Sequence, residues 1–537
     1  MNTEGSPRVL LIGPYDPHCG EYTFLAPPLG VWRLAGVLTA AGFEAKVFDP
    51  NCCREPPQRS LERELLAGNW DVVGISTTGM TLRYDLELAH IVRRMSPRAV
   101  IVAGGMEATF RPELMFELGP FDLVVLGEGE HPLLELMSRL RKGQPLGGIV
   151  GTVERNKDGQ LIKMPQSALT REELRDAIYS TPYDKMPYSA YWERLESAYR
   201  IGSLPSKAAR EAHLAEIRSV RLITLNYCPM GCTFCSSTNF LHEAQGSVAS
   251  ISRLEADECL YMIERIMAAH PKARTIIFQD DIFSFTRDRR ILPLCDAIVA
   301  AKKSGRIPAS LQFISTNRID AMTPERLTAM RRAGFRVLGF GIESFSHRVL
   351  TEFNKGQIHR HIEPNLTAAL ATGVTPFLDL ILSSPTSQLA DVAETLRQAY
   401  HWMRAGCEIG MYPYVIPFSG AQFATDPKLA PYTRYTERHV AGTTISWNQP
   451  SKILPMDPLV AEVVLQIESN FEAMLAPLER VAHLPSRVRS LLWILSSLPV
   501  MAAHGHYIAD ESEIRAELHA RLPVLKEEAA EFAVAMA

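Results

Sequence analysis

Three cysteines, Cys228, Cys232 and Cys235, are the residues of this chain whose type and spacing most directly indicate chemistry. They follow an apolar run over residues 221–227 and are separated by three and then two residues. Thiolates are the usual ligands of iron–sulfur clusters, and a [4Fe–4S] cube normally takes four of them. A compact loop that offers only three thiolates therefore leaves one iron open to a small molecule.

Two other interpretations of the cysteines are weaker. Zinc sites usually combine paired Cys-x-x-Cys units or a nearby pair of histidines, and neither pattern is present. Nine cysteines in 537 residues are too sparse, and odd in number, for a disulfide framework. Residues 1–8 are polar and lack the apolar segment of a secretory signal, so we expect a reducing, cytoplasmic location.

The Cys-x3-Cys-x2-Cys motif behind a predicted strand, with Phe234 just before its last cysteine, resembles the radical S-adenosylmethionine (SAM) superfamily. This resemblance implies that Cys228, Cys232 and Cys235 hold a [4Fe–4S] cluster. It also implies that the methionine amine and carboxylate of SAM chelate the fourth iron, with Phe234 packed near the adenine.

The region around this motif, residues 215–418, alternates apolar runs with helix-period segments such as 255–269 and 291–303. Such alternation predicts a parallel sheet with crossover helices. The resemblance implies a partial (β/α)6 radical SAM barrel, whose site residues gather at the C-terminal ends of the strands. The six predicted strands are 221–227, 275–281, 311–317, 337–344, 376–383 and 409–417.

Polar residues end three of these strands, where the family makes its SAM contacts. The carboxylates after the second strand suit the SAM ammonium. The residues after the third strand are expected to contact the ribose and carboxylate of SAM, and Glu343 supplies a further carboxylate on the ribose side. A turn over residues 382–386 resembles the Gly-x-Pro turn beneath the adenine, although the glycine is missing. Each feature alone could be an ordinary strand end. The expected cofactor-binding residues are Gln279, Asp280, Asp281, Ser315, Asn317, Arg318 and Glu343.

The first 145 residues carry a second signal. Helical patterns over 29–41 and 84–95 separate short buried strands, which predicts a doubly wound, Rossmann-like α/β domain. Neither Gly-x-Gly-x-x-Gly nor a phosphate-binding loop is present, so a dinucleotide or ATP site is not indicated. The five predicted strands are 8–13, 45–49, 72–76, 99–102 and 123–126.

Small and hydroxyl residues follow the strands of this domain in a set that resembles the cobalamin-binding domain fused to radical SAM enzymes. Glycines there let the backbone approach a ligand closely. A flavodoxin-like domain with a decayed cofactor site is the alternative. The expected cobalamin-binding residues are Ser76, Thr78, Gly104, Gly105, Gly127 and Glu128.

His18 lies in a loop one residue short of the Asp-x-His-x-x-Gly pattern that supplies a cobalt ligand in mutases. We therefore expect a base-off cobalamin without a protein ligand below the cobalt. Such a low-coordinate Co(I) is the stronger nucleophile and suits methyl transfer.

The rest of the chain divides into a connection, residues 146–214, and a C-terminal helical domain, residues 419–537. The connection contains a predicted hairpin over 148–164 with an Asp-Gly turn. The apolar run 491–503 is too short to span a bilayer and predicts a buried helix. We expect the C-terminal region to close the substrate cavity, with His504 and Tyr507 as candidates. The predicted helices there are 459–475, 486–498 and 511–534.

The resemblance implies a cobalamin-dependent radical SAM methyltransferase acting on a carbon of a small intermediate, as in natural-product biosynthesis. One SAM would methylate Co(I), giving methylcobalamin, and a second would be cleaved to a 5′-deoxyadenosyl radical. Electrons would come from an external donor such as flavodoxin or ferredoxin. A net charge of −4 gives no basic footprint for nucleic acid.

Other activities remain open. The same architecture serves cyclases and rearrangement enzymes without net methylation, and a tryptophan methylase that does not cleave SAM to a radical. A cobalamin-linked sensor or electron carrier is a different class. A carrier needs a fourth cysteine ligand, whereas Cys259, Cys295 and Cys407 fit small core residues better.

Overall fold

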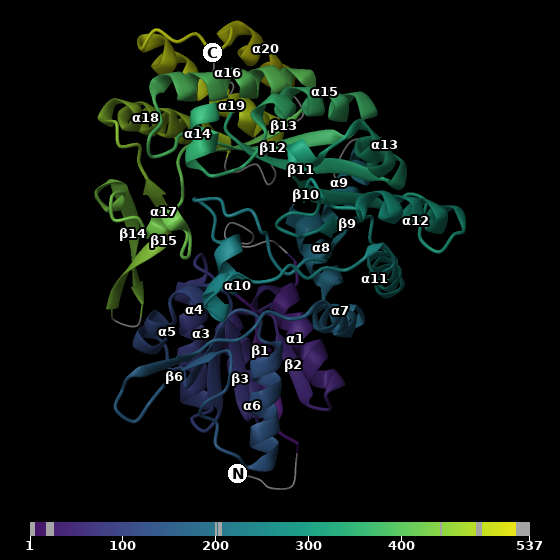
Figure 1. Cartoon of the computed structure of the whole chain (residues 1–537), viewed down its shortest axis with the longest axis vertical. Coiled ribbons are helices and arrows are strands. Elements are labelled where there is room, and N and C mark those ends of the chain that lie inside the picture. Colours follow the sequence, from purple (N-terminus) through teal and green to yellow (C-terminus); the bar gives the residue numbers. More distant parts are fainter. Residues whose placement is uncertain are drawn as a thin grey trace.

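The computed structural model of the protein describes residues 6–17, 26–198, 201, 207–440, 443–478 and 486–521. Two sheet-based parts lie one above the other (Figure 1). The N-terminal part occupies the lower half of the view, and the barrel and the C-terminal helices occupy the upper half. Helix α10 (Ser237–Gln245) lies between them.

The N-terminal part is a parallel sheet with helices on both faces, as the sequence predicts. The strand order begins β2-β1-β3-β4-β5. Helices α1 (Leu29–Ala40) and α6 (Glu130–Lys142) bury one face, and α2 (Pro57–Ala67) and α3 (Leu82–Met95) bury the other. Burial on both faces explains why the strands are continuous apolar runs. The strands are β1 (Arg8–Ile12), β2 (Glu44–Phe48), β3 (Val72–Ser76), β4 (Val100–Gly104) and β5 (Leu123–Val125).

The predicted hairpin is present as β6 (Thr152–Arg155) and β7 (Leu161–Met164). It pairs antiparallel with β5 and extends the N-terminal sheet to seven strands instead of standing between the two parts. The connection that follows the hairpin is largely helical. Its aromatic residues, such as Tyr188 and Trp192, are buried in the core that extends into the barrel, and this burial stabilises the helices. The helices are α7 (Arg171–Ser180), α8 (Tyr188–Ala198) and α9 (Lys207–Ile217).

The barrel is an open sheet of six parallel strands in sequential order, from β8 at one edge to β13 at the other. This confirms the predicted partial (β/α)6 architecture. The strands are β8 (Ser219–Leu222), β9 (Thr275–Phe278), β10 (Gln312–Asn317), β11 (Phe335–Glu343), β12 (Thr375–Ile381) and β13 (Glu408–Tyr412). The outer helices are α11 (Ala256–Ala269), α12 (Ile291–Lys303), α13 (Pro324–Ala333), α15 (Ile362–Thr372) and α16 (Leu389–Ala405).

The first barrel strand is shorter than predicted. It ends at Leu222 because the next backbone N–H groups, those of Thr224 and Leu225, donate to the carboxylate of Asp280 instead of to a neighbouring strand.

The prediction of an entirely helical region after residue 418 is wrong in one segment. Strands β14 (Thr433–Val440) and β15 (Thr443–Ile453) form an antiparallel ribbon. The ribbon pairs with neither large sheet, so it lacks the strand–helix alternation on which the prediction depended. It runs beside the two parts, from the barrel toward α3 (Figure 1).

Three C-terminal helices complete the fold, α18 (Pro458–Leu475), α19 (Ser486–Ala503) and α20 (Glu511–Arg521). The predicted helix over 511–534 extends beyond residue 521 into the part outside the described residues. Helix α19 is buried as predicted and packs on β13, so these helices share the barrel's core. None of the helices in the described ranges is long and apolar enough to cross a membrane.

His504 and Tyr507 are not placed where a substrate cavity would need them. Both follow α19 and are exposed, Tyr507 with 72% of its surface accessible. Helix α19 covers the outside of the last barrel strand, at the end of the molecule away from the N-terminal part (Figure 1). The expectation that these two residues line the cavity is therefore wrong.

Candidate cofactor and substrate site

The cysteine loop leaves the carboxyl end of β8 and runs directly into α10. Gly231 takes a φ of +66°, and its N–H donates to Thr238 Oγ1 at 3.0 Å. Asn354 Nδ2 donates to the Gly231 carbonyl at 2.9 Å, and the Thr233 N–H donates to the Phe353 carbonyl at 3.1 Å. The loop is therefore fastened on one side to α10 and on the other to the segment after α14 (His347–Glu352).

The three thiols lie near one another and are largely shielded from solvent. Cys232 is buried, and Cys228 and Cys235 are half-buried. Burial raises the pKa of Cys228 to about 12, and Asp281 and the other two thiols add to this shift. Burial also raises the pKa of Cys232, and the positive charge of Lys355 offsets part of this rise. Deprotonation is therefore coupled to metal binding, because thiolates and not thiols are the ligands.

The donor set fits an iron–sulfur cluster. Among the described residues, no group of three or more His, Cys, Asp or Glu side chains is arranged to hold one metal ion. In a four-iron cluster, each of three thiolates binds a different iron. The three sulfurs therefore need to lie around the cluster and need not surround a single metal position. Phe234, before the last cysteine, packs against Phe353 with ring centroids 4.9 Å apart.

The two adjacent carboxylates after β9 have different surroundings. Asp280 is buried, and its Oδ1 accepts from the N–H groups of Thr224 at 2.6 Å and Leu225 at 2.9 Å. Its Oδ2 accepts from Thr224 Oγ1 at 2.5 Å. Burial raises the pKa of Asp280 to about 6, and Arg290 lowers it. Both carboxylate oxygens of Asp280 therefore hold the chain end that leads into the cysteine loop.

Asp281 faces the other way. Its side chain is accessible, yet burial raises its pKa, while a hydrogen bond from Ser237 lowers it. An accessible side chain whose pKa is nevertheless raised by burial is expected where a carboxylate faces an enclosed space instead of open solvent. Its charge acts on Cys228 and Cys235, which places it beside the cysteine loop. Gln279, two residues earlier, accepts from Arg221 Nη1 at 2.9 Å.

The predicted residues at the end of β10 are buried and form hydrogen bonds with one another and with nearby backbone. Asn317 Nδ2 donates to Ser315 Oγ at 3.0 Å. Arg318 forms a two-point ion pair with Asp320, at 2.9 and 2.8 Å, and donates to the Lys355 carbonyl at 2.8 Å. Arg318 therefore fixes the loop that carries Lys355.

Glu343 ends β11 with a φ of +63°, which is uncommon for a non-glycine residue. It pairs with Lys355 at 2.8 Å, and both side chains are nearly buried. A Cβ at Gly341 would lie 2.5 Å from Glu343 Oε1, so the glycine makes room for this pair. Lys355 Nζ also lies 5.9 Å from the Phe234 ring centroid, which connects the pair to the cysteine loop.

The sequence interpretation missed Asp379 on β12. In the strand register it lies between Gly341 of β11 and Gly410 of β13, so neither neighbour fills the space beside it. Burial raises the pKa of Asp379 to about 7, Glu343 raises it further and Lys355 lowers it. No hydrogen bond or ion pair to its carboxylate occurs among the described residues. A single acidic residue in the apolar strand 376–383 was the available signal.

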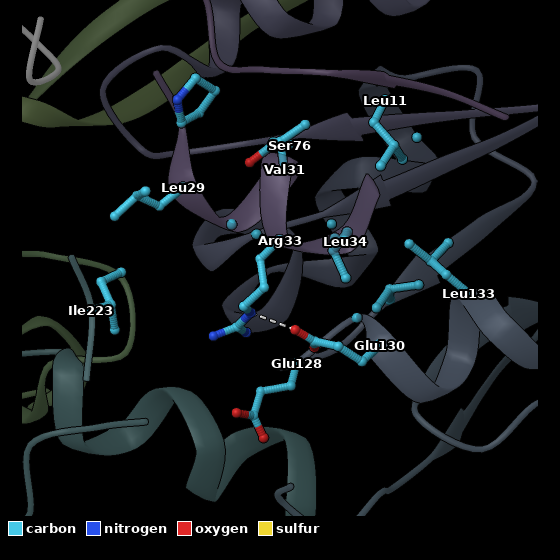
Figure 2. A pocket seen from close by; sticks show the side chains of 18 of the residues that line it. Leu11, Leu29, Val31, Arg33, Leu34, Ser76, Glu128, Glu130, Leu133 and Ile223 are labelled. Atoms are coloured by element: carbon cyan, nitrogen blue, oxygen red, sulfur yellow. Dashed lines mark ion pairs between the residues drawn. The ribbon is translucent and has the colours of Figure 1, made fainter. Parts of the chain in front are cut away.

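A cavity of about 340 Å³ lies at the carboxyl edge of the N-terminal sheet (Figure 2). Five of the six residues predicted to bind cobalamin line it, namely Ser76, Gly104, Gly105, Gly127 and Glu128. Thr78 is not among the lining residues, and its hydroxyl pairs with that of Thr81 at 2.9 Å. Barrel residues also line the cavity, among them Ile223, Leu225 and Phe240. The two parts therefore share this cavity.

The glycines of this cavity have distinct roles. Gly105 has a φ of +96°, and a Cβ there would lie 2.6 Å from the Thr77 carbonyl oxygen. Gly127 has a φ of +65°, and a Cβ would lie 2.6 Å from the Ala244 side chain of α10. At Gly104 a Cβ would have no neighbour closer than 4.0 Å, so that glycine opens space for a ligand. His18 lies outside the described residues.

Two family models match the chain in these regions. The B12 binding domain matches residues 17–137, and the radical SAM superfamily matches residues 222–399. The chain belongs to the cobalamin-dependent radical SAM enzymes. Its cofactors are cobalamin, a [4Fe–4S] cluster and SAM.

Characterised and uncharacterised relatives of this cobalamin-dependent radical SAM protein cover much of its length. An uncharacterized methyltransferase of Pyrococcus horikoshii is 24% identical over 80% of this chain and 83% of its own. Cytidylyl-2-hydroxyethylphosphonate methyltransferase of Streptomyces wedmorensis is 26% identical over 61% of this chain and 63% of its own. The anaerobic magnesium-protoporphyrin IX monomethyl ester cyclase of Rubrivivax gelatinosus is 22% identical over 77% and 69%.

A solved structure has the same fold. The radical SAM methyltransferase TsrM of Kitasatospora setae, with cobalamin and a [4Fe–4S] cluster bound, superimposes with a TM-score of 0.64 at 15% identity. The superposition covers 92% of this chain and 99% of TsrM. At this identity the likeness concerns the fold alone.

Proposed function

We propose that this enzyme transfers a methyl group from SAM, by way of methylcobalamin, to a carbon of a small biosynthetic intermediate. The shared cavity carries the proposal. Its wall includes Ile223, Leu225 and Asn226, which directly precede the cysteine loop, as well as the glycines of the N-terminal sheet. The cobalamin and cluster ends of the site therefore meet in one interior. The cofactors supply the radical and methyl chemistry, while the protein positions them and excludes side reactions.

At the cluster end, we assign Cys228, Cys232 and Cys235 to three irons and Phe234 to the adenine of SAM. Asp281 is the residue we assign to the SAM ammonium, because it is accessible and lies beside the cysteines. Asp280 is a positioning residue, since its carboxylate is already occupied by Thr224 and Leu225.

The strand ends across the barrel hold the rest of SAM in this proposal. Glu343, near Lys355 and Phe234, is assigned to the ribose hydroxyls. Gln279, Ser315, Asn317 and Arg318 are assigned to the same SAM-binding region, where their internal hydrogen bonds keep the strand ends rigid.

The substrate end is assigned to Asp379 and Tyr412. The hydroxyl pKa of Tyr412 is raised by burial and by the charges of Asp379 and Glu343, so the three groups lie close together. Tyr412 is 51% accessible although it is on a barrel strand. A free carboxylate beside an accessible tyrosine can hold a polar small molecule by hydrogen bonds.

A cyclase or rearrangement without net methylation is the second candidate, because the Rubrivivax gelatinosus cyclase aligns over a similar share of the chain. Polar methylation, in which SAM serves only as a methyl donor, is a third. Transfer of label separates methylation from cyclisation. Formation of 5′-deoxyadenosine separates the radical from the polar route.

The test incubates the reconstituted enzyme with methyl-labelled SAM, reduced flavodoxin or ferredoxin, and a cytoplasmic small-molecule extract. We expect one labelled product and 5′-deoxyadenosine in stoichiometric relation to it. A Cys232→Ala variant is the matched control and should give neither. Consumption of an extract component with 5′-deoxyadenosine but without label would overturn the methyltransferase proposal in favour of the cyclase.

A further inference from the structure

Three charged side chains meet at one end of the shared cavity. Arg33 comes from α1, Glu128 from the loop after β5, and Glu130 from the first turn of α6. Glu128 and Glu130 are buried, and Arg33 Nε lies 2.5 Å from Glu130 Oε1. Figure 2 shows Arg33 and Glu128 directed toward the side of the cavity where Ile223 lies, away from Leu11 and Leu133. The cavity therefore has one ionic end.

The other walls of the cavity are apolar. Leu11, Val102 and Val125 of the sheet lie opposite Val31, Leu34 and Leu133 of the two helices. A narrow space between a sheet and two helices, apolar along its sides and polar at one end, suits a flat ring system with a single polar edge. The corrin macrocycle is too large for about 340 Å³, whereas the nucleotide base that ends the tail of a cobalamin is a flat apolar heterocycle.

Only one oxygen of the Glu128 carboxyl accepts a hydrogen bond from the described part of the protein. Its Oε2 accepts from the Leu169 N–H at 2.7 Å, and its carbonyl accepts from Gln166 Nε2 at 2.6 Å. No other hydrogen bond to this carboxyl occurs among the described residues. Burial raises the pKa of Glu128 to about 7, with Glu130 raising it further and Arg33 lowering it. Near neutral pH the group can therefore carry a proton to donate.

We propose that Glu128 recognises the base of the corrinoid's nucleotide tail by donating a hydrogen bond to the ring nitrogen that the base would otherwise offer to cobalt. The Leu169 N–H holds Glu128 in position, and Glu130 holds Arg33 beside it. This inference rests on the proposed function, because it requires the corrinoid at the carboxyl edge of the N-terminal sheet. It also requires the base-off form, since the ring nitrogen is free only when the base is away from cobalt.

The test compares the binding of cobalamin with that of cobinamide, which has the same corrin but no nucleotide. Both are titrated into the enzyme carrying its cluster, and binding is followed by corrin absorbance, so no turnover is needed. Glu128→Leu should weaken cobalamin about tenfold and change cobinamide less than about twofold. Glu128→Gln keeps a donor and an acceptor of the same shape, so it should bind cobalamin like the wild type.

The matched control is Glu107→Gln. Glu107 on α4 (Met106–Phe110) is also a buried carboxylate, but it pairs with Arg111, the residue after that helix, and does not line the cavity. This variant should alter neither corrinoid. A general disturbance of the fold would lower the affinity for both corrinoids alike in any of these variants.

A pH series gives a second readout. The wild-type preference for cobalamin over cobinamide should fall as the pH rises from 6 to 8.5, because Glu128 loses its proton near 7. The Glu128→Gln preference should stay constant. Burial keeps the nearby Tyr183 neutral over this range by raising its pKa far above 10. The other charged groups that face this site are Arg33 and Glu130 in the cavity, and Glu173, which pairs with His131 on the surface.

Each result decides the question. Selective loss of cobalamin in Glu128→Leu, with rescue in Glu128→Gln, supports the inference. Equal loss of both corrinoids, or no loss of either, overturns it and leaves the proposed function intact. If the wild type bound neither cobalamin nor cobinamide, the placement of the corrinoid would be overturned instead.

Discussion

Replacing Asp280 tests the different roles assigned to the two adjacent carboxylates. In Asp280→Ala, the buried N–H groups of Thr224 and Leu225 lose their shared acceptor. A buried donor left without a partner costs about 1–3 kcal/mol, so two of them should lower the free energy of unfolding by about 2–6 kcal/mol. With roughly 2–4 °C per kcal/mol for a domain of this size, the barrel should melt roughly 10 °C lower.

Asp280→Asn is the matched variant. Both N–H groups donate to Oδ1, which asparagine retains, so most of the lost stability should return. Asp281→Ala should hardly change the melting temperature, because this side chain is accessible. It should instead weaken SAM binding tenfold or more, since a charge-assisted hydrogen bond contributes about 1.5–3 kcal/mol.

The assays are differential scanning fluorimetry, iron content and the SAM concentration that gives half-maximal 5′-deoxyadenosine formation. Asp280→Ala should also lose iron, because Thr224 and Leu225 lead into the cysteine loop. If Asp280→Ala melted within 2 °C of the wild type and kept its iron, the positioning role would be refuted. If Asp281→Ala left SAM binding unchanged, its assignment to the ammonium would fail.

Three further outcomes are expected. Replacing Cys228, Cys232 and Cys235 together with alanine should abolish the cluster and SAM cleavage, while cobalamin still binds, as iron analysis and corrin absorbance would show. Gly104→Leu should fill the cavity and lower cobalamin affinity with iron content unchanged, because a Cβ there would have no neighbour closer than 4.0 Å; unchanged affinity would contradict the cavity assignment. Methylation by the wild type should rise with pH through about 7 as Asp379 loses its proton, and Asp379→Asn should remove this rise without changing substrate-free 5′-deoxyadenosine formation.

The sequence was sufficient to predict the parallel strands of both large sheets, because parallel strands buried on two faces form continuous apolar runs. It did not show that the hairpin of β6 and β7 joins the N-terminal sheet. Cys259, Cys295 and Cys407 are buried core residues, as predicted from their positions in helical segments or at the start of the last barrel strand. The ribbon of β14 and β15 escaped prediction because it joins neither large sheet and its strands do not alternate with helices.

For the candidate site, the sequence indicates which residues lie at strand ends and does not indicate the direction of their side chains. Asp280 and Asp281 are identical in type and adjacent in sequence, yet one faces the backbone of Thr224 and the other an accessible space. Asp280 can accept from Thr224 and Leu225 only because β8 ends before them, and β8 ends there because these N–H groups donate to Asp280. The local sequence does not reveal this mutual dependence. Asp379 was missed because its isolation results from glycines on two neighbouring strands, which the local sequence does not reveal.

The contact of α10 with the N-terminal sheet bears on how this protein can be divided. Ala244 of α10 is buried in the hydrophobic core of the N-terminal part, and Gly127 leaves room for it. Asn239 of the same helix donates to the Gly420 carbonyl beyond the last barrel strand. A fragment that ended before the barrel would lack α10 and would leave the surface at Gly127 uncovered. An isolated barrel would expose the apolar side of α10. Exchange of modules between related enzymes would therefore succeed only if α10 travels with the N-terminal part or its contact residues are matched.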